Sequence, residues 1–100
     1  MPKFVMFYHM GNTPPADGAA MMERWQVWLA ENSGSLLEPE NPIGPAKMVD
    51  KDGVTDAGNK GLMGYGVLDC ADLDAAVALA QSCPFLDMGT LEVAEIKSRS

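Results

Sequence analysis

The sequence predicts one small α+β domain, built from a four-stranded antiparallel sheet with two helices on one face. Three observations predict this fold class. The chain has 100 residues, of which 47% are hydrophobic, as is typical of a single globular domain. Two segments carry apolar residues at helical spacing, and short apolar runs bounded by turn residues lie before, between and after them. We therefore expect one domain over residues 1–100.

The first strand and the first helix follow each other in the amino-terminal third. Residues 3–9 form a continuous, β-rich apolar run that ends at Gly11, which is typical of a strand buried on both faces. From residue 18 to residue 31 the period becomes helical. The apolar stripe of this helix consists of Met21, Trp25, Trp28 and Leu29. Asp17 is the expected N-cap, and residues 32–34 are expected to end the helix.

The middle of the chain predicts an irregular connection and a hairpin. Residues 35–37 favour a brief strand, after which Pro39, Pro42 and Pro45 remove backbone donors that a continuous ladder needs. Residues 46–51 and 54–56 flank Asp52 and Gly53, a pair suited to a two-residue hairpin turn. Because the hairpin carries few large apolar side chains, we expect it to be an exposed flap.

Residues 63–68 predict a second central strand. Its odd positions place Met63, Tyr65 and Val67 on one face, and its even positions place Gly64, Gly66 and Leu68 on the other. Interior glycines weaken a strand unless something must approach closely, so we expect a helix or a ligand against that face.

The carboxy-terminal third predicts a helix and a last strand. Residues 72–82 have helical periodicity, with Asp72 and Asp74 in the first turn, where negative charge suits the helix dipole. The expected apolar stripe is Leu73, Ala76, Val77 and Ala80. Cys83 and Pro84 end this helix, and residues 90–96 predict the last strand.

The order β-α-β-hairpin-β-α-β is that of a ferredoxin-like protomer with an extra hairpin. The two helices cover only one face of such a sheet. The first strand is nevertheless apolar on both faces, and Met63, Tyr65 and Val67 also need burial. A second subunit laid against the open face would bury them, so we expect a homodimer with its sheets packed together.

Charge and composition exclude several classes of partner. Seven Lys and Arg residues stand against fourteen Asp and Glu residues, the net charge is −7, and the cations are scattered. We therefore expect no nucleic-acid and no membrane partner. The two cysteines form neither a disulfide framework nor a zinc pattern, which favours a cytoplasmic protein. Because His9 is the only histidine, we expect no metal, and no motif indicates a cofactor.

The segment from Gly64 to Pro84 combines a Gly/Tyr-rich strand, an acidic helix start, an Ala-rich helix and a closing Cys-Pro pair. This combination resembles the YCII-related family, including its DGPF-type branch. Residues 3–8 and 89–93 look like the first and last strands of that family. The resemblance covers nearly the whole chain in order, and it implies a ferredoxin-like protomer in a dimeric α/β barrel.

The resemblance does not extend to one proposed catalytic pair. Some members of the family have a His in the first helix and an Asp just before the Pro that ends the second helix. Here the first helix contains no His, with Met22 and Trp25 in that neighbourhood, and the residue before the proline is Cys83. Of the DGPF motif, only the acidic residue Asp56 is kept. The chain is thus expected to lack the chemistry of that pair.

Five residues remain as candidates for a cleft: Tyr8, His9, Trp25, Asp56 and Tyr65. His9 follows Tyr8 at the end of the first strand, and an imidazole there would serve as an acid/base group together with Asp56 or Tyr65. The structural alternatives are a partly exposed strand-end His9, a turn-forming Asp56 and a Tyr65 packed in the dimer interface.

The remaining reactive or aromatic residues also have two interpretations. Trp25 and Trp28, with Met21 and Met22, would either line an apolar ligand pocket or pack in the core. Cys83 lies at the end of a helix, where negative potential opposes thiolate formation, so we expect a buried structural cysteine.

Two principal hypotheses for function follow. The first is a small-molecule-binding protein whose cleft holds an apolar or aromatic ligand. The alternative is a cofactor-free enzyme, monooxygenase- or isomerase-like, that uses His9 and Asp56 as acid/base groups; fold analogy alone supports it. A third class, a protein-interaction module, requires a large exposed apolar patch. A pocket faced by His9 or Asp56 would favour the enzyme.

Overall fold

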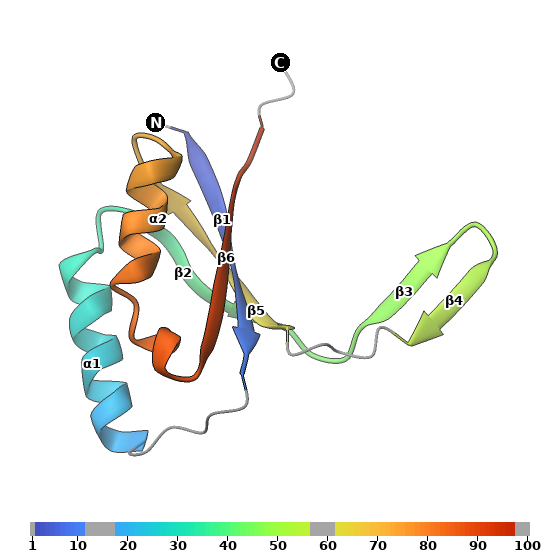
Figure 1. Ribbon diagram of the computed structural model, residues 1–100, viewed down its shortest axis with the longest axis horizontal. Coiled ribbons are helices and arrows are strands. Elements are labelled where there is room, and N and C mark those ends of the chain that lie inside the picture. Colours follow the sequence, from blue (N-terminus) through green and yellow to red (C-terminus); the bar gives the residue numbers. More distant parts are fainter. Residues whose placement is uncertain (1, 12–17, 57–61, 98–100) are drawn as a thin grey trace.

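The computed structural model describes residues 2–11, 18–56 and 62–97. In chain order its elements are β1 (Lys3–Met10), α1 (Gly18–Glu31), β2 (Leu36–Pro42), β3 (Lys47–Asp50), β4 (Gly53–Asp56), β5 (Leu62–Asp69), α2 (Leu73–Gln81), the short 3₁₀ helix η1 (Pro84–Asp87) and β6 (Gly89–Glu95) (Figure 1). The predicted N-cap Asp17 lies outside the described residues.

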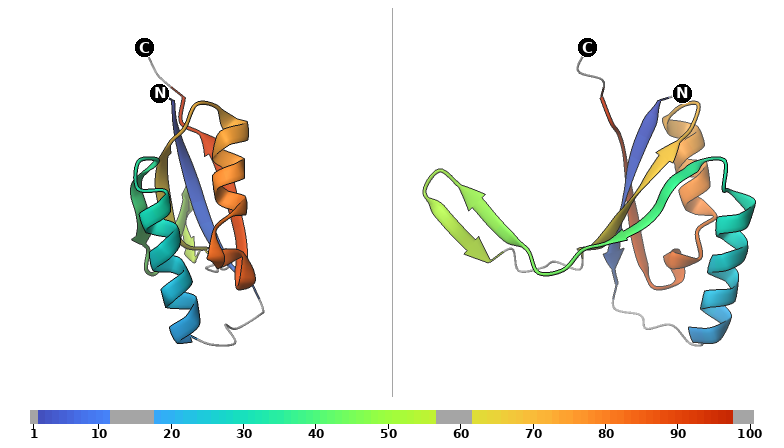
Figure 2. Two further views of the ribbon diagram at one scale, coloured as in Figure 1. Left: turned by 90° about the vertical axis from the view of Figure 1, so that its left-hand side faces the viewer. Right: turned by 180° about the vertical axis from the view of Figure 1, so that it is seen from behind.

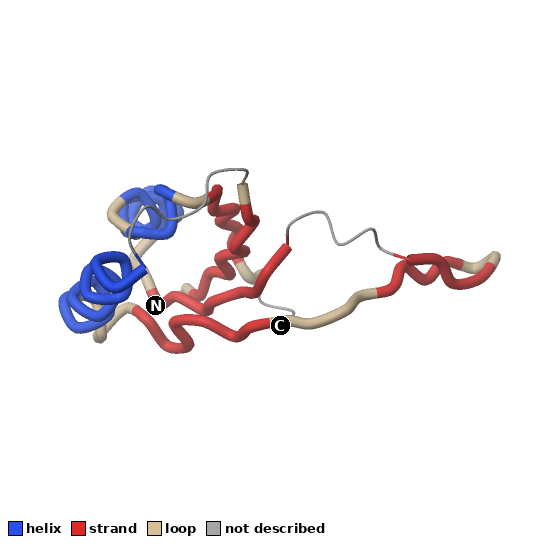
Figure 3. The backbone as a smooth tube through the Cα atoms, turned by 90° about the horizontal axis from the view of Figure 1, so that it is seen from below, coloured by secondary structure: helices blue, strands red, loops and turns tan. Residues whose placement is uncertain are grey.

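Four of the strands form one antiparallel sheet in the order β2-β5-β1-β6. Both helices lie on the same face of this sheet, as the view from below shows most clearly (Figure 3). This strand order and layering are those of the ferredoxin-like fold, so the predicted α+β class is confirmed. No helix in the described part of the chain has the length and hydropathy of a bilayer-spanning segment.

The core lies between the sheet and the helices. Alternate residues of β1 supply its centre: Phe4, Met6 and Tyr8 are at most 1% exposed. Trp28 from α1 and Leu68 from β5 pack against them. The even-numbered side chains of β1 therefore face the helices, as the period of two requires.

The opposite face of the sheet carries half-buried apolar side chains. Val5 and Phe7 of β1, and Tyr65 and Val67 of β5, are only partly covered within the protomer. Within the protomer this face of the first strand is only half-buried, because both helices lie on the other side (Figure 3). Burial of the strand on both faces requires a partner subunit and stays a prediction. An antiparallel sheet with one solvated face usually carries polar residues there, whereas these four side chains are apolar or aromatic.

The second helix presents a different stripe from the predicted one. Leu73 and Val77 are 47% and 39% exposed, whereas Ala76 and Ala80 are buried. The small alanine side chains let the helix lie close to the sheet, so they turn inward and the larger residues turn outward. Asp72 is the N-cap, and its carboxylate accepts a hydrogen bond of 2.8 Å from the amide of Ala75.

The strand β2 is longer than the predicted residues 35–37 and contains two of the prolines. It is an edge strand, where a missing backbone donor can face solvent. Its register against β5 shifts between Leu36 and Glu38 and again between Glu38 and Asn41. The prolines therefore disturb the ladder, as predicted, without ending the strand.

The glycines of β5 make room for the backbone of β2. A Cβ at Gly66 would lie 2.8 Å from the carbonyl oxygen of Pro39 and 2.9 Å from that of Glu38. A Cβ at Gly64 would lie 2.7 Å from the carbonyl oxygen of Asn41. The close approach that these glycines permit is thus made by the neighbouring strand, where we had expected a helix or a ligand.

The hairpin of β3 and β4 projects away from the sheet and helices (Figure 2), and all its residues are exposed. The predicted flap is therefore present, but its turn is centred one residue earlier than predicted. Asp50 pairs with Gly53 across the turn, so Lys51 and Asp52 form the loop. The Asp50 carboxylate accepts a hydrogen bond from the amide of Asp52 at 2.8 Å, and Gly53 adopts a φ of 144°.

We predict that Gly66→Ala destabilises the protein by about 1–3 kcal/mol, because the added methyl group collides with two backbone carbonyl oxygens that cannot rotate away. Urea unfolding followed by circular dichroism measures the loss. Gly34→Ala is the matched control, since a Cβ there meets nothing within 4 Å. Equal stability of the two variants would contradict the proposed close approach of β2.

Candidate functional site

A small apolar pocket lies between the first half of α1, the strands β2 and β5, and η1. Its volume is about 290 Å³. Aromatic and sulfur-containing side chains dominate the lining, which consists of Gly18, Met21, Met22, Trp25, Glu40, Met63, Phe85 and Met88. An apolar wall with one polar group is the usual composition of a small-molecule site.

The end of α2 positions one wall of this pocket. Cys83 is extended, with φ −75° and ψ 129°, and Pro84 then opens η1. This short helix places Phe85 beside the aromatic residues of α1. An ion pair of 2.5 Å between Arg24 of α1 and Asp87 of η1 joins the two elements on the outside. Both side chains are more than half exposed, so the pair contributes little stability.

Tyr8 forms the floor beneath the aromatic wall. Its ring meets Phe85 edge-on at 5.1 Å and Trp25 at 6.0 Å between ring centroids. Its hydroxyl donates a hydrogen bond of 2.5 Å to the carbonyl oxygen of Pro39 on β2. Tyr8 lies opposite Gly64 of β5, the strand between β1 and β2. Because glycine has no side chain, the Tyr8 ring can cross β5 to reach Pro39.

Two groups at the floor keep their protons at neutral pH. Burial raises the pKa of Tyr8 far above its usual range, and the charges of Cys83 and Glu40 add to this effect. Burial also raises the pKa of Cys83 to about 11, although a backbone hydrogen bond at Phe85 partly opposes the shift. A buried thiol with such a pKa is a poor nucleophile, which agrees with the predicted structural role.

Cys70 is also buried in the core, and its pKa is raised as well. Burial raises its pKa, and the neighbouring carboxylates of Asp69 and Asp72 raise it further. Both cysteines are free and buried. Among the described residues, no group of three His, Cys, Asp or Glu side chains is placed to hold a metal ion.

His9 lies away from the apolar pocket, on the strand positions that face the open side of the sheet. Its Nε2 is 3.0 Å from Oε1 of Glu92, on the neighbouring strand β6. The side chain is 32% exposed and that of Glu92 is 64% exposed. His9 is thus part of a cross-strand polar pair at the rim of the sheet.

Neither Asp56 nor Tyr65 forms a hydrogen bond with His9 within the described part of the chain, although Tyr65 lies on the strand that pairs with that of His9. Asp56 ends the hairpin strand β4, where its carboxylate accepts a hydrogen bond of 2.5 Å from Lys47. Tyr65 lies half-buried on the open face, opposite Phe7. Of the five predicted cleft residues, the structure brings only Tyr8 and Trp25 together. His9 and Asp56 share no hydrogen bond within the protomer.

The sequence patterns did not indicate Glu40 and Phe85 as pocket residues. Glu40 lies among prolines, where no periodicity indicated its direction. Phe85 lies between the last helix and the last strand, a segment that carried no pattern. The only available signal was the large apolar residue directly after the helix-ending Pro84.

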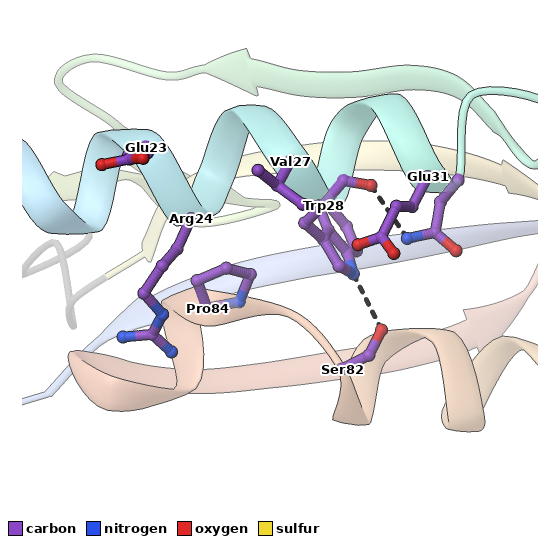
Figure 4. A pocket seen from close by; sticks show the side chains of 8 residues that line it. Glu23, Arg24, Val27, Trp28, Glu31, Ser82 and Pro84 are labelled. Carbon is purple, nitrogen blue, oxygen red and sulfur yellow. Dashed lines mark hydrogen bonds between the residues drawn. The ribbon is translucent and has the colours of Figure 1, made fainter.

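A second and larger hollow, of about 640 Å³, lies between α1 and the end of α2 (Figure 4). Its polar groups are largely occupied with each other. Trp28 donates a hydrogen bond of 2.8 Å from its indole to Ser82, and the Asn32 side chain donates one of 2.8 Å to the carbonyl of Trp28. Glu23, Arg24 and Glu31 line it with mixed charge. These contacts join the helices and define no consistent ligand chemistry.

Comparison with known proteins identifies the family. The sequence profile of the YCII-related domain matches residues 4–99, so the chain belongs to the YCII-related family. No curated protein is significantly similar in sequence. The fold is similar to that of the 5-chloro-2-hydroxyhydroquinone dehydrochlorinase TftG from Burkholderia phenoliruptrix, solved in complex with 2,5-dihydroxybenzoquinone. The TM-score is 0.55 at 12% identity, over 95% of this chain and 93% of that chain, which supports the fold alone.

We predict that Cys83 makes the protein less stable at high pH. The thiol has a raised pKa in the folded state, so its contribution is complete below its ordinary pKa of 9.0 and is lost as the pH rises through about 11. Urea unfolding at several pH values across this window should give a shallower decline for Cys83→Ala than for the wild type.

Cys70→Ala is the comparison variant, because it keeps the contribution of Cys83. Because the pKa of Cys70 is also raised, but less far, Cys70→Ala should decline slightly less than the wild type and more steeply than Cys83→Ala. Superimposable pH profiles for the wild type and Cys83→Ala would contradict the raised pKa.

Proposed function

We propose that this YCII-related protein is a homodimer that binds a small apolar or aromatic ligand without the His–Asp pair proposed for some relatives. The observation that carries the proposal is the pocket wall of Trp25, Phe85 and methionines above a buried Tyr8. Its volume of about 290 Å³ suits a compound of one or two rings. Methionine side chains adapt to ligands of different shape.

The chemistry of the pocket favours binding over proton transfer. Raised pKa values keep Tyr8 and Cys83 protonated at neutral pH. Met22 and Trp25 line the pocket from the helix on which some relatives carry the His, and Cys83 holds the position before the proline. The enzyme alternative required His9 and Asp56 at one cleft, whereas their partners are Glu92 and Lys47. No observation favours it.

Flat ring compounds are the first candidates as ligands. TftG, which shares the fold at 12% identity, was solved with 2,5-dihydroxybenzoquinone, a one-ring compound. A ligand of that shape would stack on the Trp25 and Phe85 rings. Because both described cysteines are free thiols, we place the protein in the reducing cytoplasm.

The homodimer would cover the open face of the sheet. Val5, Phe7, Tyr65 and Val67 form a half-buried apolar surface on its two central strands. Two such faces packed against each other in a two-fold arrangement make a self-complementary interface. The projecting hairpin also favours a dimer, because an isolated two-stranded hairpin has little stability and would gain from contact with a partner subunit.

We predict that Val67→Lys converts the dimer to monomers, because the two-fold axis places two buried lysines near each other in an apolar interface. Size-exclusion chromatography with light scattering should give a mass of twice 10.7 kDa for the wild type and 10.7 kDa for the variant. Val77→Lys is the matched control, since this valine is 39% exposed on the helix layer. A monomeric wild type, or a dimeric Val67→Lys variant, would count against the open-face dimer.

We predict that compounds such as indole, catechol and 2-naphthol raise the melting temperature, and that Met22→Gln weakens their binding about fivefold through lost apolar contact. Thermal shift and calorimetric titration measure the two effects. Val27→Thr is the matched control: Val27 is 53% and Met22 57% exposed on the same helix, but Val27 lies outside the apolar pocket. The proposal fails if no ring compound stabilises the protein, or if both variants bind equally well.

A further inference from the structure

We infer that Glu40 makes the apolar pocket selective for cationic ligands, namely protonated amines carried on a flat apolar body. This inference rests on the proposed ligand-binding function of the same pocket. Glu40 is the only charged residue among the described residues that line it. An amine head at Glu40 and a ring against Trp25 and Phe85 would satisfy both parts of the site.

The carboxylate of Glu40 has no competing partner. Among the described residues, none forms a hydrogen bond or an ion pair with it, and it lies at an exposed position of β2. The adjacent Asn41 amide donates its hydrogen bond of 3.0 Å to Glu38. Arg24, the cation on the same helix as Trp25, is bound to Asp87. The charge of Glu40 is therefore available to a ligand.

The position of Glu40 follows from the irregular course of β2. The register shift between Glu38 and Asn41 brings this segment over the glycines of β5, on the side of the helices. The Tyr8 hydroxyl holds the bulge through Pro39, the residue next to Glu40. A carboxylate on a fixed segment keeps its direction better than one on a mobile loop.

The negative charge acts on the interior of the site. Glu40 contributes to the raised pKa values of both Tyr8 and Cys83, so its field reaches the pocket floor. The same field that opposes a phenolate or a thiolate there also opposes an anionic ligand and favours a cation. The net charge of −7 acts in the same direction over longer distances.

The aromatic wall adds a second attraction for a cation. Trp25 and Phe85 line the pocket with their rings, Tyr8 packs edge-on behind both, and Trp25 also packs against Trp28 at 5.3 Å. A cation near the face of a Trp or Tyr ring is attracted by the ring quadrupole. Carboxylate and aromatic groups together therefore discriminate by charge, while the methionines accept varied ring shapes.

The experiment compares three probes of similar size and different charge: 2-phenylethylamine, 2-phenylethanol and 3-phenylpropanoate. Calorimetric titration at low salt should show the amine binding about fivefold more tightly than the alcohol, and the carboxylate most weakly. Glu40→Gln should remove the preference, so that the amine and the alcohol bind with about equal affinity. Added salt should reduce the preference in the wild type.

Two further variants make the result specific to Glu40. Glu38→Gln removes a carboxylate two residues away that does not line the pocket, and it should behave as the wild type. Glu40→Asp keeps the charge and should keep the preference for the amine. A Glu40→Gln variant that still prefers the amine would overturn the inference.

The outcomes separate this inference from the proposed function. Equal binding of all three probes by the wild type overturns the charge selectivity and leaves the pocket as a neutral apolar site. Tighter binding of the carboxylate also overturns it. If none of the probes binds, and ring compounds do not stabilise the protein, the proposed function fails and the inference falls with it.

Discussion

The Tyr8 hydroxyl donates a hydrogen bond to the carbonyl oxygen of Pro39, and three features of the structure depend on this contact. It ties the centre of the sheet to its irregular edge strand across the glycines of β5. It fixes the direction of the ring against which Trp25 and Phe85 pack. It also satisfies a buried polar group that would otherwise cost about 1–3 kcal/mol.

The same contact explains why the Tyr8 hydroxyl beneath the pocket neither ionises nor binds a ligand. A hydroxyl committed to a backbone carbonyl does not donate to a ligand, and its burial keeps the phenol protonated. Cys83 is held in the same dry layer, with its thiol protonated at neutral pH. Among the described lining residues, the one charged side chain is that of Glu40. It lies next to Pro39, whose carbonyl oxygen accepts the hydrogen bond from Tyr8.

Sequence patterns predicted those parts of the fold that local periodicity determines. The strand at residues 3–9 follows from its apolar run, the stripe of Trp25 and Trp28 from helical spacing, and the hairpin from its Asp-Gly pair. The course of β2 was not predictable, because Pro39 and Pro42 usually interrupt a strand. They are tolerated here because β2 is an edge strand with an irregular register. The prediction of the buried face of α2 was partly wrong, because the helix packs closely on the sheet and buries its alanines in place of Leu73 and Val77.

The candidate site was harder to predict because its members come from four elements far apart in sequence. Tyr8 and Trp25 were identified by type, whereas Glu40 and Phe85 gain meaning only from the bulge and from the 3₁₀ turn that starts at Pro84. Met22 and Trp25 line the pocket, whereas Cys83 is buried in the core just before Pro84. Apolar and aromatic side chains thus dominate the described lining, because α1 and the 3₁₀ turn direct their large residues to the same side of the sheet.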